Sequence, residues 1–480
     1  MSYNTLLYII YTCGYLFTLG LVLIALKRKK EPVSALAWIL AIILLPYIGA
    51  IIFILFGNNH IQRPLSRKRH QRSHFHTLFP FPGKNPTPLP LGVSSEYWAP
   101  LSDLVSRITD LPVTGGNEVS LYYDGRAAYE AMFQSIDAAQ KDVCFQSYIF
   151  QNDRIGQQFI ERLAAKSRQG VKVRLLYDAI GSRHLRRGTL HPLLKAGGRV
   201  VPFLPVNIFR RRIQINLRNH RKILIVDGKV GFLGGLNVGR EYIGEDPSLG
   251  FWRDTHLRIT GPAVKSLTCV FAEDWNFATK ERMPYEEETS PQNLAAGEHV
   301  LQIITGGPDQ HVNAIREWYY TVASRARHRL WISTPYFIPD ETMIDGLRMA
   351  ANMGVDVRLL TQGRPPDKWI PYLAARYYWD DMLEAGVRIW RYKKGMFHSK
   401  VILVDGILAS VGTANLNIRS LHLDFEVNCL IYSPALIAEL EKQFLQDLED
   451  SRDVVPQEFR RRSGWVQAVE NACRLFSPVL

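Results

Sequence analysis

The longest apolar runs of the chain lie in its first sixty residues. Leu6 to Leu26 contains 21 residues without a charge, and Val33 to Phe56 contains 24 more. Each run can cross a hydrocarbon core of about 30 Å as a helix that rises about 1.5 Å per residue. A short basic turn, Lys27 to Pro32, separates them. The pattern predicts a transmembrane helical hairpin over residues 1–60, and basic residues on both flanks leave its orientation open.

Residues 61–110 have the composition of a tether. They are basic in their first part, and the stretch from Phe79 to Pro90 carries too many prolines for the interior of a helix or a sheet. Such a tether would hold the rest of the chain near the membrane without fixing its angle. The last residues, 456–480, combine arginines with Trp465 and Phe476 and predict an amphipathic tail, suited equally to a bilayer surface and to the protein body.

Alternating strand and helix patterns begin near residue 119, and the alternation occurs twice. Gly170 to Leu176 and Gly354 to Leu360 are nearly identical apolar stretches, each opened by a glycine. Strand and helix in alternation predict an α/β fold with mixed sheets. A repeat of this size predicts two fused copies of one domain, over residues 111–285 and 286–455, related by a pseudo-two-fold axis and sharing one active site.

The clearest repeat is a motif with the spacing H-x-K-x-x-x-x-D. A Gly-x-x-Asn tetrad follows each copy, so each Asn lies 17 residues after its His. Residues two apart on a strand share a face, so the His and Lys of each copy emerge side by side. The tetrad suits a tight turn beside a small anion. The motif residues are His220, Lys222, Asp227 and Asn237 in the first copy and His398, Lys400, Asp405 and Asn415 in the second.

One imidazole, one cation and one amide in each copy indicate a phosphate site with two titratable bases. A phosphodiester repels anionic attack, so a neutral imidazole is a better nucleophile than a carboxylate once cations neutralise the non-bridging oxygens. In-line displacement then lets one His attack while the other protonates the departing alkoxide. Lys222, Lys400, Asn237 and Asn415 are expected to hold the oxygens. This chemistry calls for no metal and no cofactor, and the sequence offers no evident cluster of carboxylates for a metal.

With these motifs the chain resembles the phospholipase D superfamily, whose signature is the duplicated motif, and within it the bacterial cardiolipin synthases. The likeness extends over nearly the whole chain and includes the N-terminal hairpin. It also covers residues 250–256 (Gly-Phe-Trp-Arg-Asp-Thr-His), 334–340 (Thr-Pro-Tyr-Phe-Ile-Pro-Asp) and 475–478 (Leu-Phe-Ser-Pro). The resemblance implies that His220 is the nucleophile and His398 the general acid and base, although the near symmetry of the motifs does not order them.

Two further carboxylates are expected to orient the imidazoles. Asp254 and Glu426 each begin an apolar strand. The resemblance implies that each accepts a hydrogen bond from a histidine ring, which fixes the tautomer and supports the imidazolium. Glu241 competes for this role in the first copy, but its expected role is a charge at a helix start. The chain departs from the family pattern at two positions, Asn417 and Asp424.

Other residues near the motifs are expected to serve the structure. Asp227 and Asp405 lie seven positions after their histidines, on the opposite strand face and at the strand end, where capping is the common role. The aromatic residues Tyr148, Trp252 and Tyr336 are expected beside the site, where they could line an acyl or glycerol channel, although core packing is the expected role of most.

Composition adds the sign of the partner's charge. The chain has 58 Lys and Arg against 45 Asp and Glu, a net charge of +13, which favours anionic lipid, nucleic acid or a phosphorylated solute without choosing among them. Its five cysteines are odd in number, scattered and without a C-x-x-C pair, so we expect free thiols rather than disulfides or a zinc site.

These features predict a multi-pass enzyme of the cell membrane with its catalytic domains at the membrane surface. We expect it to transfer a phosphatidyl group from one phosphatidylglycerol to another through a phosphatidyl-histidine, forming cardiolipin and releasing glycerol. Its expected partners are phosphatidylglycerol and other anionic phospholipids, and nucleic acid is not expected. The alternatives are a hydrolytic phospholipase D, a transferase for another headgroup and, more remotely, a membrane-anchored nuclease. The oligomeric state and acyl preference stay open.

Overall fold

The structure is a computed structural model that divides into two compact units, Met1–Arg67 and Lys68–Leu480. Each unit has a cluster of buried apolar residues of its own. The described residues are 3–28, 32–45, 48–50, 53, 66, 68–69, 89–90, 97–205, 216–281, 283, 297–363 and 365–480.

The smaller unit contains the helices α1 (Tyr3–Arg28) and α2 (Pro32–Leu44). Leu21 and Ala25 of α1 form a small apolar cluster with Ile42, Ala50 and Phe53. No helix within the described residues combines the length and the apolar character of a membrane span. The described part of α2, for example, has 13 residues and rises only about 20 Å. The predicted transmembrane hairpin is therefore not supported as a pair of spans, although its two helices are present.

The predicted tether, 61–110, lies largely outside the described residues, and this includes most of its proline-rich stretch. Its last part is a packed helix instead, α5 (Ala99–Thr109), which has a proline in its first turn. Leu101 and Val105 of α5 are buried in the main apolar cluster of the larger unit. The prediction extended the tether to residue 110 because the prolines before this helix give no signal for the residue at which regular structure begins again.

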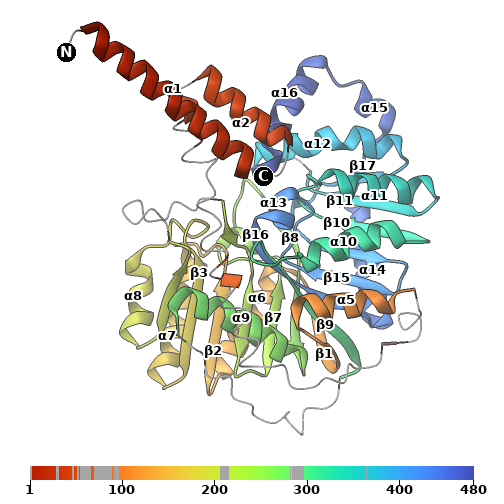
Figure 1. Ribbon diagram of the computed structural model, residues 1–480. Coiled ribbons are helices and arrows are strands. Elements are labelled where there is room, and N and C mark those ends of the chain that lie inside the picture. Colours follow the sequence, from red (N-terminus) through yellow and green to blue (C-terminus); the bar gives the residue numbers. More distant parts are fainter. Residues whose placement is uncertain are drawn as a thin grey trace. The chain divides into compact units, whose positions relative to one another are not determined.

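The first half of the larger unit runs from β1 to β8 (Figure 1). All of these strands except the short β5 form one sheet. The neighbours β4, β3 and β2 are parallel, and every other pair is antiparallel, so the sheet is mixed. In sheet order the strands are β4 (Arg199–Phe203), β3 (Lys172–Asp178), β2 (Asp142–Ser147), β6 (Ile223–Val226), β7 (Val230–Gly234), β8 (Phe251–Thr260) and β1 (Val113–Asp124).

The second half, β9 to β17, repeats this order. Its three parallel strands are again followed by antiparallel neighbours, and β17 (Ser451–Asp453) adds to the edge at β12. In sheet order the strands are β12 (Arg388–Tyr392), β11 (Asp356–Thr361), β10 (Arg329–Ser333), β14 (Val401–Val404), β15 (Leu408–Gly412), β16 (Asp424–Ile431) and β9 (His299–Gly306). The α/β fold with a large mixed sheet is thus confirmed.

The two halves are joined at several strands. β1 pairs with β9, and two short strands cross between the halves: β5 (Arg218–Asn219) pairs with β16, and β13 (Gly395–Phe397) pairs with β8. Each short strand runs directly into one H-x-K motif. The crossing pairs therefore place each motif against the other half.

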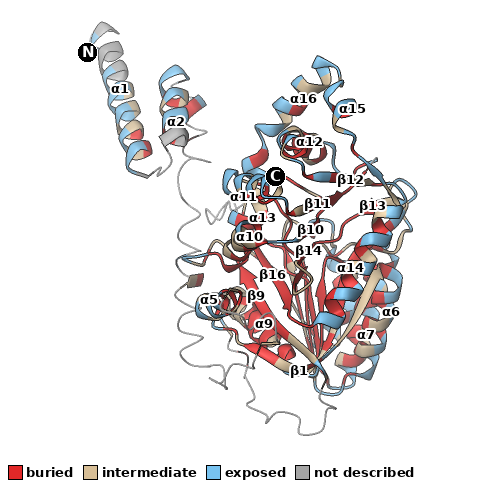
Figure 2. Ribbon diagram, turned by 90° about the vertical axis from the view of Figure 1, so that its right-hand side faces the viewer, coloured by how far each residue is buried: buried red, intermediate tan, exposed pale blue. Residues whose placement is uncertain are grey.

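Helices cover both faces of the strands. Figure 2 shows the strands mostly buried, with helices on either side whose outer faces are exposed. In the first half the helices are α6 (Gly125–Ala138), α7 (Arg154–Arg168), α8 (Arg187–Lys195), η2 (Arg240–Ile243) and α9 (Ala263–Thr279). In the second half they are α10 (Ala314–Arg325), α11 (Glu341–Asn352), α12 (Trp369–Glu384), α13 (Ile418–His422), α14 (Pro434–Glu449), α15 (Pro456–Arg460), α16 (Gly464–Arg474) and η3 (Ser477–Val479).

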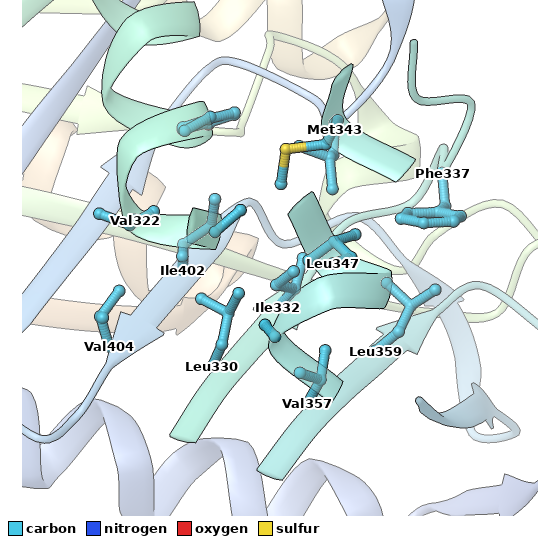
Figure 3. Close-up of a cluster of buried hydrophobic side chains, with 14 of the residues drawn as sticks. Val322, Leu330, Ile332, Phe337, Met343, Leu347, Val357, Leu359, Ile402 and Val404 are labelled. Carbon is cyan, nitrogen blue, oxygen red and sulfur yellow. The ribbon is translucent and has the colours of Figure 1, made fainter. Parts of the chain in front are cut away.

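Apolar side chains from adjacent elements make the core that holds the motif strands. In the second half, Leu330 and Ile332 of β10 lie among Leu347 of α11, Val357 of β11 and Ile402 of β14 (Figure 3). All four residues of β6 and all four of β14 are buried. Continuous apolar runs of this kind are typical of strands that are covered on both faces. The motif residues just before β6 and β14 are therefore attached to well-packed strands.

Candidate active site

The two motif histidines are fixed by the half of the molecule to which they do not belong. The backbone N–H of His220 donates to the carbonyl oxygen of Phe425 at 2.9 Å, and that of His398 donates to the carbonyl oxygen of Arg253 at 2.8 Å. Both side chains are buried. Each motif thus bonds to a strand of the other half, the first to β16 and the second to β8. These two bonds bring the motifs to one region between β8 and β16.

Each imidazole also contacts a carboxylate of the opposite half. Nδ1 of His220 lies 2.9 Å from Oε1 of Glu426, and Nδ1 of His398 lies 2.7 Å from Oδ2 of Asp254. An N–H at Nδ1 that donates to a carboxylate leaves Nε2 as the basic nitrogen. The structure therefore brings Asp254 and Glu426 to the imidazoles, and it crosses the pairs between the halves, which the sequence had not specified.

Polar neighbours hold the two carboxylates in place. Oε2 of Glu426 accepts from the hydroxyl of Thr413 at 2.5 Å. Oδ1 of Asp254 accepts from the backbone N–H of Thr255 at 2.8 Å. Hydrogen bonds of this kind lock the direction in which a carboxylate faces its imidazole. Thr413 lies within the second Gly-x-x-Asn tetrad, where the sequence analysis had assigned it no role.

Each motif lysine lies with its histidine in the short segment just before a strand, β6 in the first copy and β14 in the second. Nζ of Lys222 donates to the carbonyl oxygen of His220 at 2.7 Å, and Nζ of Lys400 donates to that of His398 at 2.5 Å. Burial lowers the pKa of Lys222 to about 7 and that of Lys400 to about 8. These ammonium groups are poorly solvated, so an anion that replaces the missing water would bind them strongly.

Burial also keeps both imidazoles neutral. It lowers the pKa of His220 well below its ordinary value, and the nearby Lys222 and Lys400 cations act in the same direction. Burial and the Lys400 cation lower the pKa of His398 to about 4. A neutral imidazole is the form that can attack phosphorus.

The two carboxylates differ in charge. Burial raises the pKa of Glu426 to about 7. Burial alone would raise the pKa of Asp254 too, but the His398 ring and the Lys400 cation hold it below its ordinary value. The pKa shifts therefore favour the ionised form of Asp254 and the protonated form of Glu426.

The tetrad asparagines are also buried, in unequal surroundings. Oδ1 of Asn237 accepts from the backbone N–H of Ile149 at 3.1 Å, and its Nδ2 donates to the Tyr242 hydroxyl at 3.0 Å. Oδ1 of Asn415 is buried and has no hydrogen-bond partner among the described residues. Asn237 thus has protein partners at both ends of its amide, whereas the oxygen of the Asn415 amide has none within the described part of the chain.

The motif aspartates lie at the far ends of their strands. Asp227 follows β6, accepts hydrogen bonds from the backbone N–H groups of Gln140 and Lys141, and has φ 54°. Asp405 follows β14, accepts likewise from the N–H of His328, and has φ 53°. β2 starts beside Asp227 and runs toward the histidine end of β6. The structure therefore does not bring these two carboxylates to the imidazoles.

The remaining candidates have roles away from the rings. Glu241 accepts from the side chain of Gln151 at 3.0 Å. Asn417 caps α13, and Asp424 forms an ion pair with Arg419 at 3.1 Å.

Three aromatic rings lie beside the imidazoles, as expected, and one of them, Trp252, is also part of a buried core cluster. Ring centroids are 4.8 Å apart for Tyr148 and His220, 5.0 Å for Trp252 and His398, and 6.4 Å for Tyr336 and His398. They exclude water from the rings. Since apolar and aromatic residues fill cores and binding sites alike, the sequence held no signal that separated these roles.

Comparison of the sequence with known proteins shows the family to which the chain belongs. The sequence matches the family described as cardiolipin synthase, PLD-like domain, at residues 132–275 and 320–448, which include both motifs. The chain belongs to this family. The N-terminal region, residues 16–58, matches a second family, described as phospholipase D-nuclease N-terminal. Membership of the cardiolipin synthase family makes the protein an enzyme of the phosphatidyltransferase class.

Curated cardiolipin synthases align with almost the whole chain. The chain is 38% identical to a cardiolipin synthase of Geobacillus kaustophilus, over 98% of this chain and 93% of the relative. It is 40% identical to one of Geobacillus thermodenitrificans, over 95% and 91%. Among solved structures, phosphatidylserine synthase of Haemophilus influenzae Rd KW20 aligns with a TM-score of 0.61 at 17% identity, over 79% of this chain and all of the other. This last likeness shows the fold.

Proposed function

We propose that the enzyme makes cardiolipin from two molecules of phosphatidylglycerol and releases glycerol. The crossed pairing of imidazoles and carboxylates, His220 with Glu426 and His398 with Asp254, is the observation that carries the proposal. Each half needs the other to complete its catalytic pair, so a single phosphodiester can lie between two imidazoles. Family membership supplies the reaction class.

In the first step Nε2 of His220 attacks phosphorus and the bond to the glycerol oxygen breaks. His398 gives its Nε2 proton to that oxygen. The charge difference between the carboxylates supports this order. Asp254, whose pKa is lowered, stabilises the imidazolium that a general acid requires, whereas Glu426, whose pKa is raised by burial, gives an imidazolium at His220 less support.

Substrate binding would allow His398 to hold the proton that it donates as general acid. Burial and then the Lys400 cation lower the pKa of His398, and a bound phosphodiester brings negative charge close to Lys400, which offsets the effect of this cation. The ring can then carry a proton in the complex. The two ammonium groups and the Asn415 amide would hold the non-bridging oxygens.

In the second step His398 acts as a base. It takes the proton from a hydroxyl of the second phosphatidylglycerol, whose oxygen forms a bond to phosphorus as the bond to His220 breaks. Cardiolipin leaves, and His398 is protonated for the next cycle. One phosphodiester replaces another, so the reaction needs neither nucleotide nor oxidant. Supply of the acceptor from a lipid surface favours transfer over hydrolysis by proximity.

The N-terminal helices would keep the enzyme at that lipid surface. Large apolar side chains of α1 and α2 are exposed, among them Leu16, Leu23, Leu40 and Leu44. Exposed apolar surface of this extent on helices suits a lipid environment. Multi-pass insertion of residues 1–60 in the cell membrane stays a prediction, which resistance of the bound enzyme to alkaline carbonate extraction tests.

The direct test uses purified enzyme in vesicles of phosphatidylglycerol. Cardiolipin and glycerol in equal amounts are the expected products. Phosphatidate as the sole lipid product would refute the synthase and favour a hydrolase. Release of nucleotides from DNA would instead favour the nuclease. Chelators are expected to leave the rate unchanged.

A further inference from the structure

A buried ionic network lies directly behind the first motif. Arg221, between His220 and Lys222 in the chain, is almost fully buried. Its Nη1 donates to Oδ2 of Asp274 at 2.8 Å, and its Nε donates to the carbonyl oxygen of Glu426 at 3.1 Å. The guanidinium therefore connects the backbone of a catalytic carboxylate residue to an aspartate of α9.

Lys68, the first residue of the larger unit, completes this network. Its Nζ lies 3.0 Å from Oδ1 of Asp274 and 3.0 Å from Oδ2 of Asp309, and the three side chains are at most 3% exposed. Nε of Arg69 donates to the carbonyl oxygen of Asp309 at 2.9 Å. Two carboxylates thus face two cations, Lys68 and Arg221, in a site that water does not reach.

A second contact links Lys68 to the same histidine. Nζ lies 4.3 Å from the ring centroid of Phe425, close enough for a cation–π interaction. The carbonyl oxygen of Phe425 is the acceptor for the backbone N–H of His220. Lys68 is therefore linked to His220 by two routes: through Asp274 to Arg221, the next residue in the chain, and through Phe425.

We propose that Lys68 is a positioning residue for the nucleophile, acting on His220 through Arg221 and Phe425. The inference rests on the proposed function, because His220 is the nucleophile there. Without the ammonium group, two buried carboxylates would face the single Arg221 guanidinium. An unpaired buried charge is unfavourable, so Arg221 would shift toward the carboxylates and away from the Glu426 carbonyl. The His220 backbone would lose its fixed position.

The test uses the full chain and four variants: Lys68→Met, Lys68→Arg, Asp309→Asn, and Lys68→Met combined with Asp309→Asn. Arg348→Met is the matched control, since Arg348 forms an exposed surface ion pair with Asp345. The measurements are kcat and KM on phosphatidylglycerol in mixed micelles, with thermal unfolding of each protein. A purely structural role would change unfolding but not kcat in the folded fraction.

Lys68→Met is expected to lower kcat by about 10-fold to 100-fold with KM nearly unchanged, because a misplacement of about 1 Å can cost about 100-fold. Lys68→Arg keeps the cation and should keep more activity. The double variant should recover most of the loss, because it removes the carboxylate left unpaired. The control should match the wild type.

An unchanged kcat in Lys68→Met, or a double variant no better than Lys68→Met, would overturn the proposal. If Lys68→Met does not fold, the double variant decides by itself: folding with kcat within tenfold of the wild type supports the proposal, and anything less overturns it. The proposed function fails separately, if the wild type yields phosphatidate only. The ratio of variant to wild-type rates still tests Lys68 in that event.

Discussion

The two halves of the active site share contacts but differ in charge. In both, Nδ1 of the histidine meets a carboxylate of the other half, and the lysine donates to the histidine's own carbonyl oxygen. The pKa values of the two carboxylates shift in opposite directions. That of Asp254 is lowered, and burial raises that of Glu426. The repeat thus supplies the geometry, and we propose that the surroundings of the carboxylates separate nucleophile from acid.

Removal of either imidazole should have the largest effect and should separate the halves. We expect His220→Ala to lose at least about 10⁴-fold in turnover and to form no covalent adduct. His398→Ala should lose about 10²-fold to 10⁴-fold, because it retains the nucleophile and lacks only the acid. Turnover and adduct formation on labelled phosphatidylglycerol measure this, with circular dichroism to verify folding. Near wild-type activity in either variant would contradict the scheme.

Isosteric changes at the carboxylates sharpen the comparison. Asp254→Asn should reduce kcat by about 10³-fold, because it removes the negative charge that supports the His398 imidazolium. Glu426→Gln should cost only about tenfold, because burial raises the pKa of Glu426 and so weakens the negative charge that the variant removes. Steady-state kinetics at neutral pH compare the two. Equal losses would mean that the charge difference does not assign the roles.

The pH dependence of kcat/KM follows from the lysines. Their pKa values, about 7 for Lys222 and about 8 for Lys400, mean that the cations are lost as pH rises through this range. Since kcat/KM reports the free enzyme, it should fall on the alkaline side from about pH 7 upward. Lys222→Arg should move this fall to higher pH, because a guanidinium stays charged. A profile that is flat to pH 9 would contradict the assignment.

The smallest effects are expected at the asparagines. Asn415→Ala should lower kcat by up to about 100-fold with little change in stability, since its amide oxygen has no partner within the described residues. Asn237→Ala should instead lower the free energy of unfolding by about 1–3 kcal/mol, because Ile149 N–H and the Tyr242 hydroxyl lose their partner. Kinetics and urea unfolding of both variants separate the two roles.

Much of the site was predictable because it is written in short, repeated patterns. The H-x-K spacing predicts that His220 and Lys222 lie side by side, and the structure keeps them together just before β6. The positions of Asp254 and Glu426 were also identified. Their crossed pairing was not, because it depends on which strands meet across the halves, β5 with β16 and β13 with β8. Local patterns carry no information on such contacts.

Other parts could not be derived from local patterns. The bond between Lys68 and Asp309 joins residues 241 positions apart, and a lysine between two arginines in a basic run looks like a solvated charge. The helix α5 follows a proline-rich stretch that suggested only a tether. Apolar length alone predicted membrane spans that the described helices do not support. Each case depends on packing partners rather than on local composition.

The covalent intermediate is the most direct test of two histidines acting on one phosphorus atom. The enzyme would be quenched during turnover of phosphatidylglycerol labelled in its phosphate, and the modified peptide mapped by mass spectrometry. The account predicts a phosphatidyl group on His220 that accumulates in the His398→Ala variant. Label on neither histidine, or on His398 with His220 unmodified, would contradict it.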